Sequence, residues 1–87
     1  MILGRVIGNI WSTRKNERLT GLKFMVVERL DHQENSTQDT FIAADNVGAG
    51  VGDTVIVVTG SAARVALEQE IPVDSTIVGI VDSVEQE

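Results

Sequence analysis

The sequence predicts an all-β fold in which five strands form a small closed or nearly closed barrel that carries one short helix. Two observations lead to this expectation. Several short segments alternate apolar residues with polar or small ones, which is the period of a β-strand. Turn-forming residues separate these segments, and one stretch has the alanine-rich composition expected of a helix. Because every step from strand to strand is short, we expect a barrel of the OB-like kind.

The first two strands are expected at residues 2–11 and 22–30. The first alternates between two faces, one carrying Ile2, Gly4, Val6, Gly8 and Ile10 and the other carrying Arg5, Ile7, Asn9 and Trp11. The second has the same period, with Leu22, Phe24, Val26 and Leu30 opposite Lys23, Met25, Val27 and Arg29. We expect Phe24 to belong to the face that points toward the core. The polar segment 12–21 should form the turn between these strands.

The remaining elements follow an exposed loop. Residues 31–39 have no apolar period and many turn formers, so we expect a hairpin loop there. Three short segments rich in β-branched residues are expected to be strands, namely 40–44, 54–59 and 76–81. Between the last two, residues 61–67 fit one short helix, with Ser61 as its N-cap residue and Pro72 beyond its end.

The length of 87 residues suits one hydrophobic core, so we expect residues 1–87 to form a single domain. A chain of this size buries only about 60% of the surface that its unfolded form exposes, which leaves it marginally stable alone. The sequence contains no cysteine, so disulfides cannot add stability, and no cluster of metal ligands is visible. Oligomerisation is the remaining way in which small domains of this kind gain stability.

The charge balance limits the partners that the chain can bind. Its formal net charge is −6, and its seven Lys and Arg residues form no basic cluster. A nucleic-acid backbone would be repelled, so we expect no nucleic-acid partner. No apolar run approaches the roughly 20 residues that span a bilayer, and residues 1–8 lack the pattern of a signal peptide. We therefore expect a cytosolic protein without a membrane partner.

The glycine-rich segment 48–53, Gly-Ala-Gly-Val-Gly-Asp, raises the question of phosphate binding. A P-loop has Lys and then Ser or Thr after its last glycine, whereas Asp53 stands there and would repel phosphate. The dinucleotide-binding pattern has a different glycine spacing and opens a helix, whereas this segment leads into an expected strand. We expect these glycines to supply positive φ angles or a close backbone approach at a tight turn.

The residues that could carry catalysis or bind a metal do not form a recognisable site. Ser61 is not part of a Gly-x-Ser-x-Gly motif, and the single histidine, His32, lies in the expected loop. The acidic neighbours of His32 resemble a solvated loop more than a zinc site, and they are Asp31, Glu34 and Asp39. Strand-end carboxylates usually accept hydrogen bonds from turn amides, and the three candidates are Asp45, Asp74 and Asp82. We expect no enzymatic activity, no cofactor and no metal.

A free-standing OB-like module that binds a small ligand or a protein is the alternative function. OB-like barrels bind single-stranded nucleic acid by stacking bases on aromatic side chains within a basic groove. This chain has few aromatic residues to build such a platform, and they are Trp11, Phe24 and Phe41. A nucleic-acid ligand is therefore not expected in this alternative either.

Several motifs occur in a defined order along nearly the whole chain. The longest is Ala-Ala-Asp-Asn-Val-Gly-Ala-Gly-Val-Gly-Asp at residues 43–53. It is followed by Gly-Ser-Ala-Ala-Arg at 60–64, by Pro-Val-Asp at 72–74 and by Ile-Val-Asp at 80–82. Weaker motifs precede these, namely Gly4-x-Val6-x-Gly8, Thr13-x-Lys15 and Leu19-x-Gly21-x-Lys23. In this order and spacing, the motifs resemble those of the EutN/CcmL family of pentameric vertex proteins of bacterial microcompartment shells.

The resemblance implies a structural role without catalysis. Such a subunit would assemble with itself into a cyclic homopentamer and close the vertices of a microcompartment shell, whose other tiles are hexameric shell proteins. The protein would lie in the shell, within the bacterial cytoplasm. A ring of this type uses a heterologous interface, in which one patch binds a different patch on the neighbour.

The resemblance also implies which residues lie at the subunit interface or the five-fold axis, namely Gly48, Ala49, Gly50, Gly60, Ser61, Ala62, Ala63 and Arg64. Their small side chains would let backbones meet closely around the axis. The guanidinium of Arg64 would pair across the interface or line a narrow opening. In the alternative, Ser61 only caps the helix and Arg64 lies in solvent.

Overall fold

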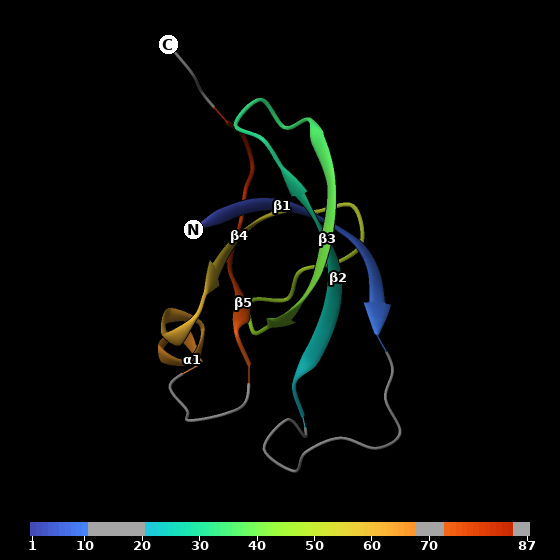
Figure 1. Cartoon of the computed structure of the whole chain (residues 1–87). Helices are drawn as coiled ribbons and strands as arrows, with labels where there is room; N and C mark the ends of the chain where they lie inside the picture. The colour runs from blue at the N-terminus through green and yellow to red at the C-terminus, as the bar shows by residue number, and fades with distance from the viewer. Residues whose placement is uncertain (11–20, 68–72, 85–87) are drawn as a thin grey trace.

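The computed structural model describes residues 1–10, 21–67 and 73–84, and within these ranges the chain forms five strands and one helix. The elements in chain order are β1 (Ile2–Ile10), β2 (Lys23–Leu30), β3 (Ser36–Asp45), β4 (Thr54–Thr59), α1 (Ser61–Ala66) and β5 (Ser75–Ile80). The strands close into a barrel in the order β1-β2-β3-β5-β4 (Figure 1). The expected closed barrel with one short helix is therefore confirmed.

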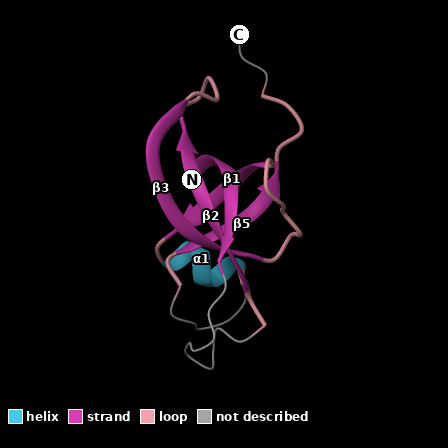
Figure 2. Cartoon of the chain, turned by 90° about the vertical axis from the view of Figure 1, so that its right-hand side faces the viewer, coloured by secondary structure: helices cyan, strands magenta, loops and turns pink. Residues whose placement is uncertain are grey.

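Antiparallel pairing builds most of the barrel. β1 pairs with both β2 and β4, β2 pairs with β3, and β4 pairs with β5. The barrel closes where β3 and β5 run parallel, and this seam consists of Ala44 opposite Thr76 and Asp45 opposite Ile77. Figure 2 shows α1 at one end of the barrel and the connection between β2 and β3 at the other.

The core fills the inside of the barrel. Its buried side chains come from all five strands and the connection between β3 and β4, and they are Val6, Met25, Val27, Ala43, Ala49, Val55, Val57 and Ile77. The prediction that Phe24 faces this core is wrong. Phe24 lies on the other face of β2 and packs, partly buried, on a smaller cluster of Ala44, Leu67 and Val73. Both faces of β2 are apolar, so alternation alone did not distinguish the inner face.

The expected loop 31–39 is shorter than predicted, because β3 already begins at Ser36. Exposed polar side chains hid this part of the strand, which is held by backbone pairing with β2. The Asp31 carboxylate organises the remaining turn by accepting hydrogen bonds from the amides of Gln33 (2.8 Å) and Asn35 (3.0 Å). The hydrogen bonds from Asn35 and Gln33 hold the pKa of Asp31 below its ordinary value of 3.8.

The helix begins differently from the prediction. Gly60, with φ 65°, occupies the N-cap position, and α1 has no side-chain cap. Ser61 is instead the exposed first residue of the helix. The chain enters the helix through the positive φ angle of Gly60, which a residue without a side chain adopts easily. The buried Thr76 hydroxyl donates to the Ala63 carbonyl (2.9 Å) and ties α1 to β5. Residues 12–20 of the expected turn 12–21, and Pro72, lie outside the described residues.

Candidate functional site

The buried end of β3 determines how the glycine turn, residues 46–53, leaves the barrel. The Asp45 side chain is only 4% exposed, and its carboxylate accepts hydrogen bonds from the amides of Val47 and Ala49, both at 3.0 Å. Ala49 then places its methyl group in the barrel core. The expectation that a strand-end carboxylate binds turn amides is confirmed for Asp45. The carboxylate therefore acts as a structural anchor of the turn.

The second half of the glycine turn is held by Asp53. Its carboxylate accepts a hydrogen bond from the Gly50 amide (2.8 Å), and its own amide donates to the Gly50 carbonyl (3.0 Å). Gly48 and Gly52 have φ angles of 84° and 97°, which confirms the expected positive φ at these two positions. The Asp53 carboxylate thus already accepts the hydrogen bond of the Gly50 amide, which is one of the donors that a phosphate-binding turn would need. This geometry argues against a phosphate site.

The glycine turn contacts both β1 and α1. Two backbone hydrogen bonds join it to β1, from the Gly52 amide to the Val6 carbonyl (2.8 Å) and from the Val6 amide to the Asp53 carbonyl (2.9 Å). The side-chain amide of Asn46 donates to the Ala66 carbonyl at the end of α1 (3.3 Å). The structure therefore connects the two segments that the sequence singled out, although Asn46 itself was not among the expected site residues.

The helical segment 60–64 presents a surface of small residues. The exposed members are Gly60, Ser61 and Ala62, and the Gly60 amide is bonded to the Asp74 carbonyl (2.8 Å). Arg64 is half-buried, and its Nη1 donates to the Val73 carbonyl (3.2 Å). The alternative in which Ser61 caps the helix and Arg64 lies free in solvent is therefore wrong for this subunit.

Two of the eight expected contact residues point into their own subunit. Ala49 is 2% exposed and Ala63 is fully buried, so neither methyl group can touch a neighbouring chain. Gly48 is exposed and Gly50 is half-buried on the turn. The surface that remains consists of glycine backbone, the Ala62 methyl group, one hydroxyl and one guanidinium. It suits close approach of another backbone more than catalysis.

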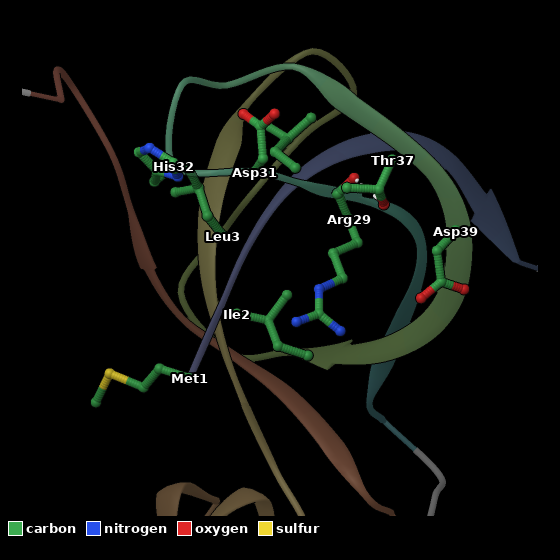
Figure 3. A pocket seen from close by; sticks show the side chains of 9 residues that line it. Met1, Ile2, Leu3, Arg29, Asp31, His32, Thr37 and Asp39 are labelled. Atoms are coloured by element: carbon green, nitrogen blue, oxygen red, sulfur yellow. Dashed lines mark hydrogen bonds between the residues drawn. The ribbon is translucent and has the colours of Figure 1, made fainter.

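An open pocket of about 550 Å³ lies at the other end of the barrel, beside the turn 31–35. Figure 3 shows the Arg29 side chain lying between Ile2 and Asp39. The polar side chains of this pocket are mostly exposed, as Arg29, His32 and Asp39 illustrate. No group of three or more His, Cys, Asp or Glu within the described ranges is close enough to hold a metal ion. Over the same ranges, no helix is long and apolar enough to cross a membrane.

Comparison with known proteins identifies the family of this chain over nearly its whole length. A family model described as "Ethanolamine utilisation protein EutN/carboxysome" matches residues 1–82. The chain is 48% identical over 86 residues to the bacterial microcompartment shell vertex protein GrpN of Rhodospirillum rubrum, covering 98% of this chain and 97% of GrpN. It is 42% identical over 88 residues to the carboxysome shell vertex protein CcmL of Synechococcus elongatus, covering 100% of this chain and 89% of CcmL.

A solved structure agrees with these sequence matches. The GrpN structure from Rhodospirillum rubrum, described as a pentameric microcompartment shell protein, matches with a TM-score of 0.91 at 46% identity. The match covers 100% of this chain and 99% of GrpN, so it includes both the barrel and the two segments described above. The chain therefore belongs to the EutN/CcmL family, as its motifs predicted.

Proposed function

We propose that this protein is a non-catalytic shell subunit that forms the pentameric vertices of a bacterial microcompartment. The observation that carries the proposal is the full-length match, in fold and sequence, to relatives named shell vertex proteins, one of them described as pentameric. Residues 1–87 act as one domain in this proposal. The protein works in the microcompartment shell in the bacterial cytoplasm, with itself and hexameric shell proteins as partners.

Physical chemistry supports assembly as the role. A barrel of this size is marginally stable alone, and burying apolar surface against a neighbour offsets that deficit. A flat sheet of hexamers cannot close into a shell, whereas a five-fold unit introduces the curvature that closure needs. A subunit of this kind has to present shaped surfaces, and it needs no reactive group.

The segments 48–50 and 60–64 lie at the subunit contacts or near the five-fold axis in this proposal. Exposed glycine and alanine positions allow backbones of neighbouring copies to approach closely. Arg64 uses one nitrogen on the Val73 carbonyl, and a guanidinium has five N–H donors, so further donors remain for a neighbour or a narrow opening. Ala49 and Ala63 hold the two segments in place from inside the subunit.

The absence of catalysis is also a proposal. Asp45, the strand-end carboxylate that is buried, already accepts two amide hydrogen bonds. Asp74 and Asp82 both lie exposed on the surface, one before and one after β5. The three aspartates are thus better explained as turn and surface residues than as a catalytic set.

Co-expression with a hexameric shell protein tests the vertex function. Electron microscopy should show closed polyhedral particles when this protein is present and open sheets or tubes when it is left out. Adding back the purified protein should restore closure. Identical assemblies with and without it would contradict the vertex role, even if the protein forms a ring by itself.

A further inference from the structure

We propose that neighbouring copies meet through two uncharged rows of residues on different outer faces of the barrel. The first row crosses three strands and consists of Gly8, Val26 and Ile42. The second row also crosses three strands and consists of Leu3, Ile56 and Gly79. The first row of one copy packs against the second row of the next. This inference rests on the proposed homopentamer and names the surfaces that build it.

Strand register aligns the first row. Gly8 on β1 is opposite Val26 on β2, and Val26 is opposite Ile42 on β3. The adjacent residues Val27 and Ala43 are buried in the core, so Val26 and Ile42 point outward by alternation. Ile42 is 54% exposed although it lies within a strand.

The uncovered part of this face has clear limits. One step along the same face, Phe24 is opposite Ala44, and the Leu67 and Val73 side chains pack against this pair. That cover does not extend to Ile42. On the β1 side, Gly8 has no side chain to cover Val26, since a Cβ there would lie 3.8 Å from the Val26 side chain. The apolar surface therefore continues from the covered pair Phe24 and Ala44 to the pair Val26 and Ile42, of which Ile42 is exposed.

The second row has a matching construction. Leu3 on β1 is opposite Ile56 on β4, and Ile56 is opposite Gly79 on β5. Val55 and Val57 are fully buried, so Ile56 points outward and is half-buried. Gly79 leaves open space, because a Cβ there would only reach ordinary contact, 4.0 Å from Ile56 Cδ1. This glycine leaves the space beside the Ile56 side chain without a side chain of its own.

The two rows face different directions, as a closed ring requires. β2 and β3 lie on the right of the barrel in Figure 1, and β4 and β5 lie on the left. A cyclic assembly uses two different patches on each copy, so one face alone could not build it. The exposed Ile42 side chain of one copy can pack over Gly79 of the next, which gives the interdigitation that well-packed interfaces show.

Charge supports another copy as the occupant. Each chain has a net charge of −6, so identical chains repel one another overall. Two copies can therefore approach most easily through surfaces that carry no charged side chain. Neither row contains a charged residue. The rows also adjoin the two proposed contact segments. The glycine turn pairs with β1 at Val6, close to Gly8, and α1 packs on β4 and β5, the strands that carry Ile56 and Gly79.

A charge substitution tests the first row. Ile42→Asp should raise the protein concentration needed for half-assembly by at least about tenfold, because the new carboxylate must be desolvated in the contact. Gln33→Asp adds the same charge in the exposed turn 31–35 and should assemble like the wild type. Circular dichroism should show a native barrel in both. Ile42→Asp rings as stable as wild-type rings would overturn the inference alone, whereas a wild type without rings would overturn the homopentamer too.

Cysteine cross-linking tests the pairing of the two rows. The chain has no cysteine, so introduced thiols are the only ones present. Oxidation of the double variant Ile42→Cys/Gly79→Cys should give covalent oligomers up to the full ring on a denaturing gel. Each single variant should stay monomeric there, because residue 42 meets residue 79 and not its own copy. Cross-linked single variants, or an uncross-linked double variant that still forms five-fold rings, would refute the pairing.

Discussion

Replacing Asp45 with alanine should destabilise the protein strongly, because this carboxylate holds the start of the glycine turn. It accepts hydrogen bonds from the Val47 and Ala49 amides, both at 3.0 Å. Water can reach the exposed Val47, but Ala49 is only 2% exposed, so its amide would lose its partner inside the protein. Hydrogen bonds to charged groups contribute about 1.5–3 kcal/mol each, and with one amide rehydrated we expect a loss of about 3 kcal/mol.

The assay is urea unfolding at one fixed protein concentration, since assembly and stability are coupled. In thermal unfolding at the same protein concentration, a loss of about 3 kcal/mol corresponds to a fall in Tm of roughly 12–24 °C for a chain of this size. Asp45→Asn keeps one carbonyl oxygen as an acceptor and should lose roughly half as much. Asp74→Ala, at an exposed position next to a strand, is the control and should change stability by less than about 0.5 kcal/mol. The reasoning is refuted if Asp45→Ala costs less than about 1 kcal/mol.

Three further predictions follow from single contacts. Arg64→Glu should disrupt the ring while circular dichroism stays near native, and an intact ring would remove Arg64 from the interface. Thr76→Val should cost about 1–3 kcal/mol in urea unfolding, because the buried Ala63 carbonyl loses its hydroxyl donor, whereas Thr76→Ser should be milder. The pKa of Asp31 is lowered in the folded protein. The ionised carboxylate therefore stabilises the turn fully when the pH is above the ordinary pKa of 3.8. This stabilisation is lost as the pH falls through the lower pKa of the folded state. NMR titration should give Asp31 a midpoint below 3.8, and a midpoint at or above 3.8 would contradict the turn geometry.

Local patterns in the sequence predicted much of the fold, for physical reasons that are visible in particular elements. β4 has the expected bounds, Thr54–Thr59, because all six of its residues are β-branched, which favours a strand. β3 was harder, since its first residues are exposed and polar, and backbone pairing with β2 is what makes them a strand. The inner face of β2 was also hidden, because Phe24 on the outer face finds a second apolar cluster.

The candidate site was predictable in composition but not in direction. Small residues at 48–50 and 60–64 indicated close backbone approach, yet nothing in their order shows that Ala49 and Ala63 point inward. Ile42 was not among the expected contact residues, although the proposed first row includes it. Because Phe41 packs on the core, alternation turns Ile42 outward, where its side chain is 54% exposed.

Native mass spectrometry of the purified protein at low micromolar concentration tests the central claim most directly, because it counts the subunits in each particle. The account predicts a dominant species with five copies of the chain. A stable monomer would contradict the preassembled ring and favour a free-standing binding module of the same OB-like fold.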